Sequence, residues 1–114
     1  MRRSTAPEIN ETAFQKQVEQ LASALGWNYY HTFNAYRSVA GFPDLVLVSE
    51  QQRRTVFAEL KSEKGKPTKK QREWLRVLAA AGEETYLWRP SDWEDIVKVL
   101  NAAALTKTDR GRRE

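Results

Sequence analysis

Three charged residues stand at the ends of two apolar segments. Asp44 begins the run DLVLV, and Glu59 and Lys61 lie at the end of TVFAELK. Charged side chains are rarely buried unless they are paired or bind a metal. Glu59 and Lys61 are two residues apart, so in a strand both side chains leave the same face. The spacing therefore indicates a site, with a surface salt bridge as the alternative.

A turn at SEQQRR, residues 49–54, makes the two segments an antiparallel hairpin and brings Asp44 beside Glu59 and Lys61. Two neighbouring carboxylates repel each other unless a cation lies between them. Mg²⁺ prefers oxygen ligands, lowers the pKa of a bound water and stabilises charge on a phosphate. An ammonium group beside it can orient that water or offset phosphate charge. These groups are the ones that phosphodiester hydrolysis requires.

The surrounding elements follow from hydrophobic periodicity and turn signals. Their order is αβββαβα, which predicts an α/β fold with a short mixed sheet between helices, in three layers. The expected helices and strands cover residues 11–25, 27–33, 44–48, 55–61, 68–81, 85–88 and 91–100.

Two helix starts carry capping-box patterns, Thr68 with Gln71 and Ser91 with Glu94. The continuous apolar run 44–48 predicts a strand that is covered on both faces. In the segment 55–61, alternation places Val56, Ala58 and Leu60 on one face and Phe57, Glu59 and Lys61 on the other.

The chain has 114 residues, no cysteine and a net charge of +4. This length predicts one domain, residues 1–105, followed by a basic flexible tail, residues 106–114. Without cysteine there is neither a disulfide nor a zinc-thiolate site. We expect a cytoplasmic protein, in a bacterium or a phage-infected cell, because neither a signal peptide nor a membrane span is visible.

A cluster of four lysines follows Lys61 directly, at a loop and the next helix start. Phosphate contacts with DNA are one interpretation, and a solvated face is the other. We refer to it as the lysine cluster: Lys64, Lys66, Lys69 and Lys70.

Together, these motifs resemble those of the stand-alone VRR-NUC nucleases of phages and bacteria, which belong to the PD-(D/E)XK superfamily. The resemblance runs from about Glu11 to Leu100. Its motifs are E-x-x-x-Q (Glu11, Gln15), R-S-x-x-G-F-P-D-L (Arg37 to Leu45), E-L-K-x-x-x-G (Glu59 to Gly65) and T-x-x-Q (Thr68, Gln71). P-D followed by E-x-K is the superfamily pattern.

The resemblance implies a restriction-endonuclease-like α/β/α core and a DNA endonuclease that depends on Mg²⁺, with Mn²⁺ as a substitute and no other cofactor. Its metal ligands would be Asp44, Glu59, the Leu60 carbonyl and the additional acid Glu11. Lys61 would assist the attacking water, and Gln71 would lie at the catalytic centre. The residues expected to contact DNA are Gln15, Tyr36, Arg37 and the lysine cluster.

Similar stand-alone proteins form homodimers, and two active sites suit a four-way (Holliday) junction. So small a chain offers little surface for reading sequence, which favours structure-specific cleavage. Two alternatives remain open. One is a sequence- or strand-specific nicking endonuclease of a phage or mobile element. The other is a DNA-binding protein of the same fold that does not cleave.

Overall fold

The computed structural model describes residues 8–33 and 39–102. Its elements follow the predicted order, with a short 3₁₀ turn added before the last helix. Their bounds are α1 Glu11–Ala24, β1 Asn28–His31, β2 Leu45–Ser49, β3 Arg54–Leu60, α2 Lys69–Ala80, β4 Glu84–Trp88, η1 Pro90–Asp92 and α3 Trp93–Asn101. None of these helices is long and apolar enough to span a membrane.

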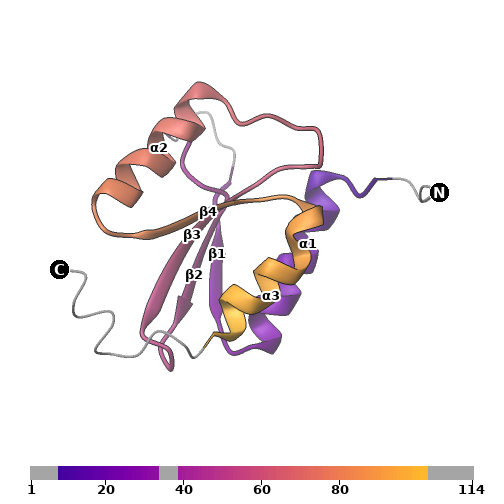
Figure 1. Ribbon diagram of the computed structural model, residues 1–114, viewed down its shortest axis with the longest axis vertical. Helices are drawn as coiled ribbons and strands as arrows, with labels where there is room; N and C mark the ends of the chain where they lie inside the picture. Colours follow the sequence, from indigo (N-terminus) through magenta and orange to yellow (C-terminus); the bar gives the residue numbers. More distant parts are fainter. Residues whose placement is uncertain (1–7, 34–38, 103–114) are drawn as a thin grey trace.

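The four strands form one mixed sheet in the order β1-β2-β3-β4. The first three strands pair antiparallel, and β4 runs parallel to β3. Helices α1 and α3 lie together on one face of the sheet, and α2 lies on the other (Figure 1). The predicted three-layer α/β/α architecture is therefore confirmed.

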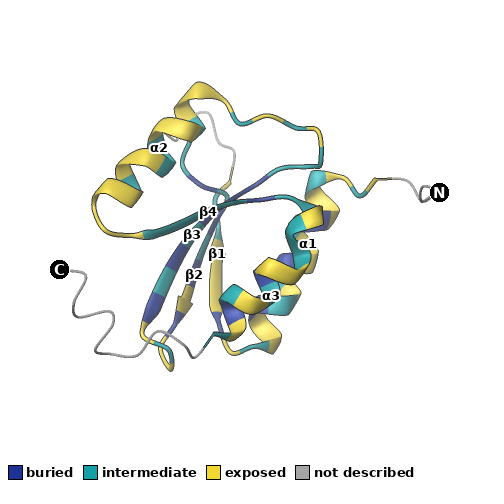
Figure 2. Ribbon diagram, in the orientation of Figure 1, coloured by how far each residue is buried: buried dark blue, intermediate teal, exposed yellow. Residues whose placement is uncertain are grey.

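The main core lies between the sheet and the α1–α3 pair, where buried residues face one another (Figure 2). Along β3, Val56, Ala58 and Leu60 point into it, as the alternation predicts. The helices add Phe14, Val18, Ala22, Ile96 and Leu100. By contrast, none of the residues of α2 is buried. The α2 face of the sheet is thus the more open one.

A buried arginine joins β3 to the end of α3. The Arg54 guanidinium pairs with Glu84 at 2.5 Å and donates to the Val99 carbonyl at 2.8 Å. It also lies 5.1 Å from the ring centre of Trp27, whose indole N–H donates to the Leu100 carbonyl. These bonds satisfy the last carbonyls of α3, which have no partner inside the helix.

Two sequence predictions are wrong. Strand β2 is not covered on both faces, since Val48 is 41% exposed. The reason is that α2 packs against β3 and β4 and leaves this face of β2 open. Ser91 and Glu94 do not form a capping box, because Pro90–Asp92 takes a 3₁₀ turn first. The Asp92 carboxylate accepts from the Arg89 backbone N–H at 2.8 Å, and no side chain caps α3.

Candidate active site

The register of the β2–β3 hairpin places Asp44 opposite Glu59. Leu45 pairs with Ala58, so the next residues outward along the two strands are Asp44 and Glu59. Opposite residues of an antiparallel pair project to the same face. The predicted hairpin is confirmed, and it brings the two carboxylates together at the end away from the turn.

Backbone bonds hold Asp44 in place. Thr32, just after β1, donates its N–H to the Asp44 carbonyl and its hydroxyl to the Pro43 carbonyl, each at 2.8 Å. The Leu60 N–H donates to Asp44 Oδ2, also at 2.8 Å. The carboxylate is therefore fixed by the strand that carries Glu59. The sequence did not single out Thr32, because its role depends on how β1 and β2 pair.

The segment before Asp44 is anchored on α2. Gly41 has φ +95°, and a Cβ there would lie 2.7 Å from the carbonyl carbon of Lys70, so only glycine fits. Phe42 places its ring edge-on against Phe57 and Trp74, with centroids 6.1 and 5.0 Å away. These contacts tie the GFPD segment to the first turns of α2, beside the two carboxylates.

The Glu59 carboxylate is the group of the site whose environment is the most unusual. Its side chain is fully buried, and neither carboxylate oxygen has a hydrogen-bond partner among the described residues. Burial, and then the charge of Asp44, raise the pKa of Glu59 to about 8. Native proteins rarely leave buried polar atoms unsatisfied, so such a group calls for an explanation.

Lys61 is the cation of the site. Its ammonium lies 3.7 Å from Glu59 Oε2, and only 12% of its side chain is exposed. Its backbone N–H donates to the Trp88 carbonyl at 3.0 Å, which extends the β3–β4 pairing. The charge of Lys61 lowers the pKa of Glu59, but burial and Asp44 outweigh it.

A hard divalent cation fits this donor set. Two carboxylates share the site, and the buried Glu59 oxygens accept no hydrogen bond from the part of the chain that the structure describes. Mg²⁺ is commonly held by one or two protein carboxylates and keeps several waters. Across residues 8–33 and 39–102, no three His, Cys, Asp or Glu side chains gather to hold a metal ion. The site therefore offers a carboxylate pair rather than a complete protein cage.

Three other predicted residues, Glu11, Gln15 and Gln71, lie near the starts of α1 and α2. Glu11, in the first turn of α1, is near enough for its charge to raise the pKa of Glu59. Gln15 donates to Glu19 at 2.9 Å, and Gln71 closes the predicted capping box with Thr68 at 2.8 and 3.1 Å. These bonds account for both glutamines structurally. The direct roles of Glu11, Gln15 and Gln71 stay predictions.

The lysine cluster lies in the loop after β3 and at the start of α2. All four lysines are exposed. Lys64 lies 4.0 Å from Glu8, an exposed pair that solvent screens. Four exposed cations thus follow the strand that carries Glu59 and Lys61. Tyr36 and Arg37 lie outside the described residues.

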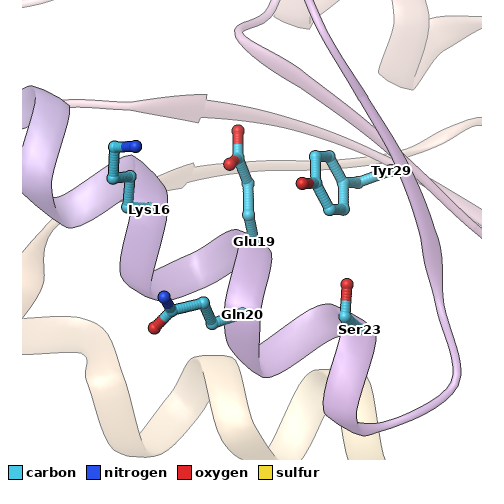
Figure 3. A pocket seen from close by; sticks show the side chains of 5 residues that line it. All are labelled: Lys16, Glu19, Gln20, Ser23 and Tyr29. Carbon is cyan, nitrogen blue, oxygen red and sulfur yellow. The ribbon is translucent and has the colours of Figure 1, made fainter.

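A shallow hollow beside α1 is separate from the carboxylate pair. It has a volume of about 330 Å³ and is lined by Lys16, Glu19, Gln20 and Ser23 of α1 and Tyr29 of β1 (Figure 3). None of the residues of the carboxylate pair or its cation lines it. We assign it no part in the chemistry.

The comparisons with known proteins agree with this fold. The family model for the VRR-NUC domain matches residues 2–92, whereas none of the curated proteins matches the sequence. A solved VRR-NUC domain is 22% identical, with a TM-score of 0.65 over 81% of this chain and 95% of its own. A solved VRR-NUC domain protein is 19% identical, with a TM-score of 0.61 over 82% and 87%.

A third solved structure is the Holliday junction resolvase Hjc from Archaeoglobus fulgidus, an archaeal hyperthermophile. It is 21% identical to this chain, with a TM-score of 0.52 over 69% of each chain. At this level of identity the solved structures show a common fold.

Proposed function

We propose that this chain, which belongs to the VRR-NUC domain family, is a metal-dependent endonuclease that hydrolyses phosphodiester bonds in DNA. The observation that carries the proposal is the fully buried Glu59 carboxylate, which has no hydrogen-bond partner among the described residues and lies opposite Asp44, 3.7 Å from the Lys61 ammonium. A binding surface gains nothing from an unsatisfied buried carboxylate. A metal-binding site gains a ligand from such a carboxylate.

Each residue has a role that follows from its position. Asp44 and Glu59 would hold the metal, Mg²⁺ or Mn²⁺, with the Leu60 carbonyl as a further ligand. The ion would supply a Lewis acid that stabilises charge on the phosphate and lowers the pKa of a water. The Leu60 N–H keeps the Asp44 carboxylate facing Glu59. The Lys61 ammonium orients the attacking water and offsets charge on the scissile phosphate.

We further propose that the enzyme is a homodimer that cleaves branched DNA such as four-way junctions. The face of β1 and β2 that α2 leaves open supports a dimer. There Tyr30 is 62% exposed and pairs with Val46, and Val48 is 41% exposed. Exposed apolar side chains that adjoin on one sheet face are typical of an interface. The fold shared with Hjc supports a junction as the substrate.

A supercoiled plasmid with an extruded cruciform tests both parts of this proposal. A dimeric junction nuclease cuts opposite strands within one complex and yields linear plasmid in Mg²⁺. EDTA should stop cleavage, and a plasmid without the cruciform should stay supercoiled. Glu59→Gln, purified in parallel, is the control for a contaminating nuclease.

Other outcomes of this assay identify the alternatives. Nicked circles from both plasmids would indicate a sequence- or strand-specific nicking enzyme. Binding of the cruciform without any cleavage, in Mg²⁺ or Mn²⁺, would indicate a DNA-binding protein that has kept the fold and lost the reaction. Nicked circles from the cruciform plasmid alone would contradict the dimer and leave the nuclease.

The lysine cluster should contact the DNA backbone. Each phosphate contact on a duplex adds roughly 0.9 to the slope of log affinity against log salt. Replacing Lys64, Lys66, Lys69 and Lys70 by glutamine should therefore reduce that slope by roughly 2 to 4. Duplex binding by fluorescence anisotropy measures it, in a Glu59→Gln background that prevents cleavage.

The matched control removes cations elsewhere. Lys16 and Lys98 are also exposed, on the outer faces of α1 and α3. Their replacement by glutamine should change the slope by no more than roughly 0.9, the contribution of one phosphate contact. If the slope is the same in the cluster variant and in the parent, the lysine cluster is a solvated face and does not contact DNA.

A further inference from the structure

The loop that follows Lys61 is tied to the end of β4. One nitrogen of the Arg89 guanidinium, Nη1, donates to the carbonyls of Ser62, Glu63 and Gly65 at 2.7, 3.1 and 2.6 Å. These carbonyls belong to a segment that is neither helix nor strand. One side chain, from the residue just after β4, therefore fixes the path of the chain after the E-L-K motif.

Arg89 makes these bonds without an ion pair. Among the described residues, none of the salt bridges involves its guanidinium. The two nearby acids bind backbone instead. Asp92 accepts from the Arg89 N–H at 2.8 Å, and Glu63 accepts from the Ser91 N–H. Each segment thus donates to or accepts from the other: Glu63 of the loop accepts from the Ser91 N–H, and the Arg89 guanidinium donates to the loop carbonyls.

This loop lies against the side chain of Lys61. At Gly65 a Cβ would lie 3.5 Å from Lys61 Cδ and 3.1 Å from Ser62 Oγ. The backbone at Gly65 therefore covers the stem of the lysine, and the Gly65 N–H closes the turn on Ser62. Lysine side chains are usually exposed, yet only 12% of this one is. The loop is therefore one of the segments that keep most of the Lys61 side chain out of solvent.

We propose that Arg89 is a positioning residue for Lys61. By holding three carbonyls of the loop, it keeps Gly65 on the lysine stem and the ammonium beside Glu59. Without Arg89 these carbonyls turn to water, the loop opens, and Lys61 gains rotamers that do not face the carboxylate pair. The effect on catalysis rests on the proposed function, whereas the ordering of Lys61 does not.

Two measurements on Arg89→Ala test this. The first is ¹³C relaxation of the Lys61 Cε group, which reports how ordered the side chain is. In the unmodified protein it should be clearly more ordered than Lys66, and in the variant it should approach Lys66. The second is single-turnover cleavage at saturating DNA. It should be about 10- to 100-fold slower, because small misplacements of catalytic groups cost rates of this size.

Chemical rescue separates positioning from a general loss of structure. Alanine leaves space for a guanidinium, so added ethylguanidinium should restore part of the order and of the rate in Arg89→Ala. It should restore nothing in Lys61→Met. Arg76→Ala is the matched control, because Arg76 is exposed and pairs with exposed Glu73 on α2. If Arg89→Ala melts below the assay temperature, Arg89→Lys takes its place under the same criteria.

The proposal is overturned if Lys61 stays as ordered in the variant as in the parent. It is also overturned if DNA affinity falls while the rate at saturating DNA stays unchanged, since Arg89 would then be a phosphate contact. A parent protein that cleaves no DNA would instead defeat the proposed function, and the relaxation of Lys61 would still decide the role of Arg89.

Discussion

Replacing Glu59 with glutamine is expected to stabilise the metal-free protein at alkaline pH and to abolish cleavage. Burial and the charge of Asp44 raise the pKa of Glu59 from 4.5 to about 8. Between these two pH values the folded protein keeps a proton that the unfolded chain releases. Stability therefore falls as pH rises through this window and levels off above about pH 8. Glutamine stays neutral throughout and avoids the loss.

The expected difference is large enough to measure by melting. One pKa unit corresponds to about 1.4 kcal/mol, so even partial relaxation around Glu59 leaves about 2 kcal/mol at pH 9. For a domain of this size that is a melting temperature about 10 °C higher in Glu59→Gln than in the parent. At pH 5 the two proteins should melt within a few degrees of each other.

Glu73→Gln is the matched control, because Glu73 is exposed and the hydrogen bond from Arg76 lowers its pKa. Its melting difference from the parent should not change between pH 5 and pH 9. A Glu59→Gln difference that is equally independent of pH would show that the carboxylate is not destabilised in the folded protein.

Mg²⁺ should reverse the order of the two proteins. An ion that binds only the folded state stabilises it by RT ln(1 + c/Kd), where c is the Mg²⁺ concentration, so the gain grows with that concentration. At pH 8, added Mg²⁺ should raise the melting temperature of the parent and not that of Glu59→Gln, and EDTA should remove the gain. Cleavage by Glu59→Gln should fall on the order of a thousandfold, which is about 4 kcal/mol of transition-state stabilisation. Asp44→Asn should lose cleavage in the same way.

Much of this site is visible in the sequence because local rules position it. Alternation along β3 puts Glu59 and Lys61 on one face, and the short turn after β2 brings Asp44 opposite Glu59. The Thr68–Gln71 capping box forms because both of its partners lie within one helical turn. Each of these features depends only on residues close in the chain or on one hairpin.

What the sequence did not predict depends on distant partners. Val48 is exposed because of where α2 packs, which a continuous apolar run does not encode. Arg54 and Arg89 look like ordinary surface cations. They bind carbonyls of α3 and of the loop after Lys61, which are near only in the folded chain. The capping pattern at Ser91 failed because Pro90 favours the start of a helical turn and moves the helix start onward.

Replacing Lys61 with methionine should slow cleavage far more than it weakens DNA binding. Methionine keeps most of the buried stem and removes the ammonium that lies 3.7 Å from Glu59. One cation is a small part of an interface with several lysines, so the dissociation constant should rise less than about threefold. The same cation acts at the reacting phosphate, where one lost electrostatic contact costs about 10²- to 10³-fold in rate.

The pH dependence distinguishes this role from a simple packing effect. Because the charge of Lys61 lowers the pKa of Glu59, its removal raises that pKa further above about 8. The ionised carboxylate that a metal requires then forms only at higher pH. The rising limb of the pH–rate profile at fixed Mg²⁺ should therefore move to more alkaline pH in Lys61→Met. Higher Mg²⁺ should move it part of the way back.

Lys66→Met is the control for this variant, since Lys66 is exposed in the lysine cluster. It should weaken binding slightly and leave both the single-turnover rate and the pH profile unchanged. If Lys61→Met loses binding and cleavage in parallel, or if its pH profile does not move, then Lys61 contacts phosphate only. The two carboxylates would in that case act without an ammonium partner in the chemical step.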